Sequence, residues 1–212
     1  KVIMASIVST TKAKGKRQAS YVIAGLGNPG SEYGHTRHNT GRRAVEALAV
    51  RATRSALSGG RVALEPWRED ATLKALRAGG ESAGERLTLL LPQQFMNGSG
   101  ASIAPLIKNA RAAERLIVVY DDLDLPLGVV KISFGRSSGG HKGLESVIRA
   151  LKTPDFVRVR IGIAPRSRRA GERRASRPAR RKSEGPCGED GKPRGEEAVL
   201  DFLLGAFSAR EE

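Results

Sequence analysis

The sequence predicts an α/β domain in which a sheet is covered by helices on both faces. Short apolar runs typical of strands alternate with longer stretches in which apolar residues recur at helical spacing. The 212 residues suit one domain with tails, and only 4% are aromatic, so Leu, Ile, Val and Ala must form most of the core. No apolar run approaches the ~20 residues that a membrane span needs. We therefore expect a single domain with no membrane segment.

The predicted elements begin with a strand over residues 21–24, an apolar run that Gly25 ends. Residues 42–57 are predicted to form an amphipathic helix, because four apolar residues recur in them at helical spacing. Further strands are predicted over residues 62–67, 72–77, 87–91, 116–120, 129–134 and 157–163, of which 116–120 gives the strongest signal. Further helices are predicted over residues 101–110, 144–151 and 196–204. Pro105 implies a kink or a late start in the first of these helices.

The net charge of +15 is concentrated in two segments. Residues 1–20 contain five basic and no acidic residues, and residues 165–195 contain eleven basic and four acidic residues with almost no large apolar side chain. Such segments bury too little surface to offset their ordering entropy. We predict a flexible basic tail over residues 1–20 and a disordered basic insertion over residues 165–195, within a domain of residues 21–212. The charge favours a polyanionic partner such as nucleic acid, and a solubilising role is the simpler alternative.

Signals of processing and of redox chemistry are sparse. Cys187 is the single cysteine, which excludes an internal disulfide framework and a structural Cys/His zinc cluster. The chain begins with Lys1, which is consistent with a trimmed or incomplete amino terminus. Residues 1–20 lack a secretory apolar stretch, and their basic, acid-free composition is similar to that of an organellar transit sequence. We therefore expect a cytoplasmic or mitochondrial location.

Gly25-Leu26-Gly27-Asn28-Pro29-Gly30 matches a dinucleotide-binding pattern, and Glu46 follows at about the distance of a ribose-binding acid. In such sites, however, the glycine loop opens directly into a helix whose N-terminus holds the pyrophosphate. Here Asn28-Pro29-Gly30 is a turn signature, and a polar stretch over residues 31–41 separates it from the next helix. The pattern is better interpreted as a turn than as a nucleotide site.

Four polar clusters follow or flank predicted strands, where α/β sheets place their sites; their central residues are Asn28, His38, Asn97 and Asp121. Singly, each has an ordinary explanation as a turn asparagine, a surface histidine or a solvated carboxylate. Together they supply an imidazole with a pKa near neutrality, a carboxylate to orient it, and amide donors for a polarised carbonyl oxygen. No Gly-x-Ser-x-Gly elbow is present and Cys187 lies in the insertion, so attack by a His-activated water is favoured over a covalent intermediate.

The sequence resembles the bacterial-type peptidyl-tRNA hydrolase family at residues 25–30, 33–41, 92–100, 121–128, 138–144, 159–163 and 202–208. The similarity extends over residues 21–164 and 198–208. The resemblance implies a single α/β domain with a mixed, largely parallel sheet. It also implies an enzyme that cleaves the ester between a nascent peptide and tRNA, with no metal and no other cofactor. His38 then activates water, and Asp121 orients His38.

The resemblance also implies a substrate-binding set, which is Asn28, Tyr33, Asn97, His141 and Lys142. The asparagines at 28 and 97 position the peptidyl group and polarise the ester carbonyl, and Tyr33 lies near the tRNA terminus. Many relatives have asparagine where this chain has Lys142, and a lysine can meet a phosphate instead. The insertion falls near the mobile lid of the family. Relatives usually continue beyond the position of Glu212 into a helix that contacts tRNA, so the chain is expected to be truncated there or to make that contact elsewhere.

Two other functions remain open from the sequence. The first is a non-catalytic RNA-binding relative that acts in organellar RNA splicing. The second is a metal-dependent phosphohydrolase that uses Asp121, Asp122 and Asp124. The favoured partner is tRNA that carries a peptidyl group, and we expect a monomer that binds neither a membrane nor a metal.

Overall fold

The computed structural model describes residues 19–57, 62–165 and 196–207. The tail predicted over residues 1–20 and the insertion predicted over residues 165–195 lie outside the described residues, except at their edges. At the first of these edges, Ser20 already belongs to strand β1 (Ser20–Gly25). No helix in the described ranges has both the length and the apolar character needed to cross a bilayer.

The described strands form one eight-stranded mixed sheet in the order β2-β4-β5-β1-β6-β8-β7, with β3 paired to β4. The four central strands run parallel to one another: β5 (Glu85–Pro92), β1, β6 (Leu116–Pro126) and β8 (Val157–Ala164). Antiparallel strands flank them on both sides: β2 (Val62–Leu64), β3 (Arg68–Asp70) and β4 (Ala75–Ser82) on one, β7 (Val130–Phe134) on the other. The mixed, largely parallel sheet is therefore confirmed.

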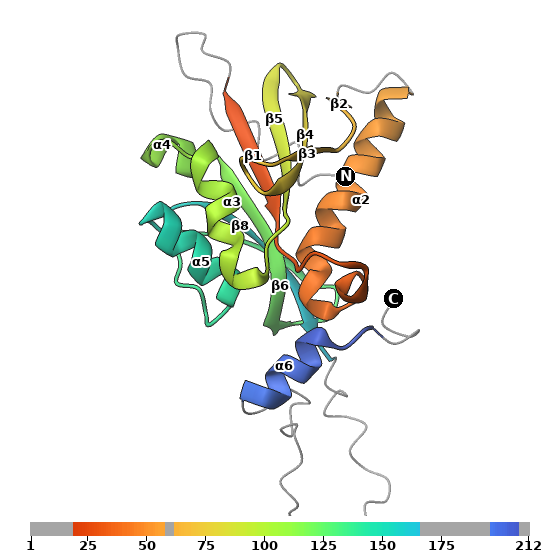
Figure 1. Ribbon diagram of the computed structural model, residues 1–212, viewed down its shortest axis with the longest axis vertical. Coiled ribbons are helices and arrows are strands. Elements are labelled where there is room, and N and C mark those ends of the chain that lie inside the picture. The colour runs from red at the N-terminus through yellow and green to blue at the C-terminus, as the bar shows by residue number, and fades with distance from the viewer. Residues whose placement is uncertain (1–18, 58–61, 166–195, 208–212) are drawn as a thin grey trace, which may run out of the picture.

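Helices cover both faces of the sheet, as predicted. Helix α2 (Thr40–Leu57) lies on one face, and α3 (Ser99–Ile103), α4 (Ala110–Ala113) and α5 (Lys142–Leu151) lie on the other (Figure 1). Alternate side chains of β1 enter the two cores: Val22 packs in the cluster with α3 and α5, whereas Ile23 packs in the cluster with α2. Central strands buried on both faces explain why their sequences are continuously apolar.

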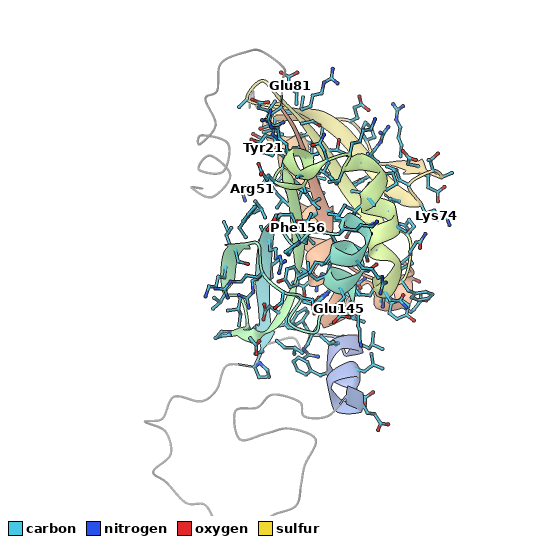
Figure 2. All side chains as sticks on the ribbon, turned by 90° about the vertical axis from the view of Figure 1, so that its left-hand side faces the viewer. Tyr21, Arg51, Lys74, Glu81, Glu145 and Phe156 are labelled. Atoms are coloured by element: carbon cyan, nitrogen blue, oxygen red, sulfur yellow. The ribbon has the colours of Figure 1, made fainter. Side chains whose placement is uncertain are left out.

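Glycine allows α3 and α5 to approach closely on their shared face, which is turned toward the viewer in Figure 2. A Cβ at Gly100 would lie 2.1 Å from the Ser146 carbonyl oxygen, and the Ser146 hydroxyl accepts a hydrogen bond of 3.0 Å from the Gly100 N–H. This contact holds α5 against α3, and the first turn of α5 lies at the end nearest α6 (Glu196–Leu204), where Figure 2 labels Glu145.

Four predicted elements differ from the structure, and the first is the strand predicted over residues 62–67, which ends at Leu64 as β2. The helix predicted over residues 101–110 is α3, a 3₁₀ turn at Ala104–Leu106 that contains Pro105, and the separate α4. The strand predicted over residues 72–77 is shifted to β4, because it forms a hairpin with β5 through a turn in which Ala83 and Gly84 have positive φ. The strand predicted over residues 116–120 continues to Pro126, so the aspartates at 121, 122 and 124 lie in the strand itself.

Candidate active site

His38 lies in a 3₁₀ turn, Arg37–Asn39, between β1 and α2. The glycine segment over residues 25–30 does not open directly into a helix: the 3₁₀ turns Ser31–Tyr33 and Arg37–Asn39 separate it from α2, and the Thr36 hydroxyl donates to the Tyr33 carbonyl oxygen at 2.8 Å. The glycine segment is thus a loop that lacks the helix of a dinucleotide site. Its candidate ribose acid, Glu46, instead pairs with Arg42 on α2 at 3.1 Å.

The His38 imidazole binds the carboxylate of Asp121 on β6. Nδ1 of His38 lies 3.0 Å from Oδ1 and 2.9 Å from Oδ2 of Asp121, and both side chains are buried. A carboxylate can only accept, so Nδ1 carries the proton and donates it. Nε2 of the neutral ring then keeps its lone pair, which is the arrangement that a general base requires.

A second imidazole binds the same carboxylate. Nε2 of His141 lies 3.0 Å from Oδ1 of Asp121, and Nδ1 of His141 accepts the backbone N–H of Leu144 at 3.2 Å as the N-cap of α5. Because Nδ1 accepts, the neutral ring carries its proton on Nε2 and donates it to Asp121. Asp121 therefore receives N–H donors from two histidines.

Asp121 is held as an anion by these donors. Burial raises the pKa of the Asp121 carboxyl, but the charges and hydrogen bonds of His38 and His141 lower it further, so the pKa lies well below its ordinary value. A carboxylate that stays ionised throughout the neutral range is suited to orient a base and to stabilise it when it becomes protonated.

Asn28 is fixed by a residue next to the candidate base. The side-chain amide of Asn39 accepts the Asn28 N–H at 2.8 Å and donates to the Asn28 carbonyl oxygen at 2.9 Å. The side-chain Oδ1 of Asn28 accepts the N–H of Met96 at 2.8 Å. The bonds from Asn39 fix the Asn28 backbone and the bond from Met96 orients its side-chain amide, whose Nδ2 has no acceptor in the described part of the chain.

A cavity of about 540 Å³ opens beside the histidine pair. His38, Asp121, His141 and Lys142 line it, together with residues of β6, β7, β8 and α6. Helix α6 lies beyond the carboxyl end of β6 (Figure 1) and contributes Leu200 and Leu203.

Helix α6 is attached directly to the turn that carries His38. Thr36 forms a β-bridge with Ala206, and the N–H of Arg37 donates to the Gly205 carbonyl oxygen at 3.0 Å. The Arg37 guanidinium also lies over the ring of Phe202, 4.4 Å from its centroid. Helix α6, which forms one wall of the cavity, is therefore connected directly to the turn that carries His38.

The remaining predicted residues occupy different surroundings. Tyr33 makes an edge-to-face contact with Phe95, with ring centroids 6.1 Å apart, and Asn97 is exposed in the 3₁₀ turn Met96–Gly98. Asn28, Tyr33 and Asn97 are not among the described residues that line the cavity. These three residues follow β1 and β5, whereas the cavity lies over β6, β8 and β7. The His38–Asp121 pair therefore lies between these residues and the cavity.

Sequence reasoning missed two supporting residues. Asn39 stood beside His38 in the sequence, but nothing in the pattern indicated that it binds Asn28. Arg158 of β8 is 1% exposed, and its guanidinium donates to the backbone carbonyls of Arg136, Ser137 and Pro154. An alternating strand such as Val157–Ala164 gave no signal that one of its arginines is fully buried.

The ligand atoms of His38, Asp121 and His141 lie within 4.8 Å of one another and form the one group of metal-ligand type among the described residues. Their hydrogen bonds already join them, so a cation would have to displace the bridging protons. Asp122 is occupied differently: it binds Arg160 at 2.5 Å and accepts the N–H of Asp124 at 2.8 Å. This geometry does not support a metal site built from the three aspartates.

Comparison with known proteins assigns the family. A family model described as peptidyl-tRNA hydrolase matches residues 22–176. The chain belongs to the peptidyl-tRNA hydrolase family. Among its relatives, a peptidyl-tRNA hydrolase of Aquifex aeolicus is 36% identical over 192 residues, which cover 90% of this chain and 80% of the relative. A peptidyl-tRNA hydrolase of Synechococcus sp. CC9311 is 43% identical over 155 residues, 73% of this chain and 70% of the relative.

A solved structure agrees with the sequence relatives. The crystal structure of peptidyl-tRNA hydrolase from Acinetobacter baumannii superposes with a TM-score of 0.67 at 30% identity, covering 93% of this chain and 82% of that chain. Membership of the peptidyl-tRNA hydrolase family, expected from the motifs, is therefore confirmed, and so is the α/β fold that the resemblance implied.

Proposed function

We propose that this protein hydrolyses the ester that joins a peptide to tRNA, with His38 as the base that activates water. The observation that carries the proposal is the His38–Asp121 pair, in which Nδ1 is held at 2.9–3.0 Å and the ring borders a cavity large enough for part of a substrate. Family membership supports the substrate class.

In the proposed reaction, Nε2 of His38 takes a proton from water as the water oxygen attacks the ester carbonyl carbon. The negative charge that develops on the carbonyl oxygen is met by amide donors, for which Asn28 and Asn97 are the candidates. The tetrahedral species then collapses, the bond to the ribose oxygen breaks, and protonated His38 returns its proton to that oxygen. The products are a free peptide, whose new carboxyl group releases its proton to the solvent, and tRNA with a free ribose hydroxyl.

The substrate-binding roles follow from the same assignment. Asn28 supports it best, because the Met96 N–H orients its side-chain amide and Asn39 fixes its backbone. Tyr33, beside Phe95, offers an aromatic surface for the tRNA terminus. Lys142 is exposed at the rim of the cavity, where an ammonium group can bind a phosphate of the tRNA end.

The proposed partner is peptidyl-tRNA, bound by a monomer that needs no metal and acts in the cytoplasm or a mitochondrion. The basic composition supports a polyanionic substrate. The splicing alternative, in which the protein binds RNA without catalysis, makes the opposite prediction in one assay. It requires tRNA binding by the natural protein without release of tRNA from N-blocked aminoacyl-tRNA.

The decisive experiment is release of tRNA from N-blocked aminoacyl-tRNA by the natural protein and by His38→Ala. Loss of the base is expected to lower kcat by roughly 10²–10⁴-fold, with an unchanged circular dichroism spectrum. His35→Ala, at an exposed histidine three positions earlier, is the matched control and should retain activity. Near-normal turnover by His38→Ala would overturn the assignment of the base, and a natural protein without turnover would overturn the function.

A further inference from the structure

His141 occupies a position that the hydrolysis of an ester does not by itself explain. Both of its ring nitrogens are used by the protein, Nε2 by Asp121 and Nδ1 by the N–H of Leu144. Its ring also packs between two others: the centroids of the His38 and Tyr120 rings each lie 4.9 Å from that of His141. A side chain engaged on every polar atom has no donor or acceptor left for a substrate.

The segment that delivers His141 is itself anchored from the sheet. Arg158 donates to the carbonyl oxygens of Ser137 at 2.6 Å and of Arg136, just before Gly139 and Gly140, both of which have positive φ. The His141 carbonyl oxygen accepts the N–H of Glu145 in the first turn of α5, the turn that Figure 2 marks at the α6 end of the helix. His141 is therefore set in place by β8 on one side and by α5 on the other.

The hydrogen bonds on Asp121 are shared unequally between its two oxygens. Among the described residues, Oδ2 accepts only from His38, at 2.9 Å, whereas Oδ1 is 3.0 Å from Nδ1 of His38 and 3.0 Å from Nε2 of His141. Each N–H donor stabilises the negative charge of the buried carboxylate, so the charge that either donor meets is reduced by the other.

We propose that His141 is a positioning residue that acts on His38 through Asp121: its Nε2–H fixes the carboxylate and limits how strongly the carboxylate stabilises protonated His38. This proposal rests on the proposed function, in which His38 must be neutral to accept a proton. It also replaces substrate binding, the role expected of His141 from the family pattern, with a role inside the protein.

Removal of the His141 donor has a definite electrostatic direction. Asp121 then directs its whole charge at His38 and favours the imidazolium, so His38 becomes protonated at a higher pH. Water activation needs the neutral ring, so activity on the acid side is lost at a higher pH than in the natural protein.

The other charged groups around His38 and Asp121 are the same in the natural protein and in a variant that lacks the His141 donor. They are Arg37 beside His38, Asp122 and Asp124 of β6, Arg136 of the loop, Lys142 of α5, and Arg158 and Arg160 of β8.

Two variants separate positioning from folding. His141→Asn keeps a side-chain acceptor for the Leu144 N–H, because asparagine is among the best N-caps, but it is too short to reach Asp121. His141→Gln can place its Nε2 where the imidazole Nε2 lies and can donate to Asp121. We expect His141→Asn to fold, to lose roughly 10-fold in kcat with KM unchanged, and to show the acid limb of its pH profile at higher pH. We expect His141→Gln to return the acid limb toward its natural position.

A second measurement does not depend on turnover. The chain has only three histidines, so the ¹⁵N resonances of the imidazoles can be assigned and titrated in the natural protein and in His141→Asn. His38 should titrate at higher pH in the variant, and His141 of the natural protein should carry its proton on Nε2.

An unchanged His38 titration would overturn the proposal. So would a KM increase in both variants with an unmoved acid limb, which is the result that direct substrate binding predicts. If His38 titrates at higher pH in His141→Asn than in the natural protein, but the natural protein hydrolyses no substrate, the proposed function is overturned. The positioning role of His141 is then retained.

Discussion

Asn39 has no expected contact with the ester, yet its side chain determines where the backbone of Asn28 lies. Asn39→Ala leaves the N–H and the carbonyl of Asn28 without their partners in a buried setting, which costs about 1–3 kcal/mol of unfolding free energy. Because Asn28 then loses its orientation, kcat/KM for N-blocked aminoacyl-tRNA is expected to fall as well. Urea denaturation and the hydrolysis assay test the two effects.

The matched control is another asparagine with a purely local role. Asn109→Ala removes the N-cap of α4 and should cost about 1 kcal/mol, with no loss of activity. If Asn39→Ala loses stability but keeps its kcat/KM, the positioning of Asn28 does not matter for catalysis.

At the residue scale, the catalytic pair could be predicted because its chemistry is visible in the sequence. An imidazole and a carboxylate followed two predicted strands, and the family pattern joined them across 83 positions. The link between Asn39 and Asn28 could not be predicted, because it depends on the path of the turn over residues 28–39. The second histidine on Asp121 was equally hidden, since a residue beside a glycine-rich loop gives no sign of which atoms it faces.

At the element scale, the start of α2 must touch the strand that carries Asp121. A Cβ at Gly41 would lie 2.2 Å from the Val119 carbonyl oxygen and 2.8 Å from the Tyr120 Cα, both backbone atoms of β6. Gly41→Ala therefore has to separate α2 from β6 and, with it, His38 from Asp121. We expect a loss of about 1–3 kcal/mol in stability and a clear loss of kcat.

Gly79→Ala in β4 is the control for this change. Its Cβ would meet no atom closer than Oε2 of Glu65, at 3.8 Å, so stability and activity should stay close to natural values. Thermal unfolding and single-turnover hydrolysis compare the two variants. A Gly41→Ala protein with natural stability and turnover would show that α2 can shift without moving His38.

The predicted elements matched the structure best where a segment is buried on both faces. The strands predicted over residues 21–24 and 116–120 were found because both of their faces are buried, which leaves a continuous apolar run. The helix predicted over residues 101–110 divided because Asn109 caps a new helix, α4, beyond the 3₁₀ turn at Pro105. The shift of β4 depended on its pairing with β5, which local sequence does not encode.

At the scale of the whole molecule, +12 of the net charge of +15 falls in residues 1–20 and 165–195 of the sequence. Residues 165–195 alone carry a net +7, so replacing them with a Gly/Ser linker of equal length should weaken tRNA binding and make it less dependent on salt. Binding measured at several salt concentrations gives the slope for each protein. An unchanged slope would show that the insertion makes no phosphate contacts and that the tRNA is held by the domain itself.

Because Ala206 bridges to Thr36, the cavity is completed only once residue 206 has been added during synthesis. His38, Asp121 and His141 have all been made once residue 141 is added, and domains begin to fold from their N-terminal parts as the chain emerges from the ribosome. Leu200 and Leu203 are added only after β8 has been made, and they form one side of the cavity. A partly made chain can thus join its histidines to Asp121 while that side stands open. The full cavity exists only after residues 200–206 have left the ribosome.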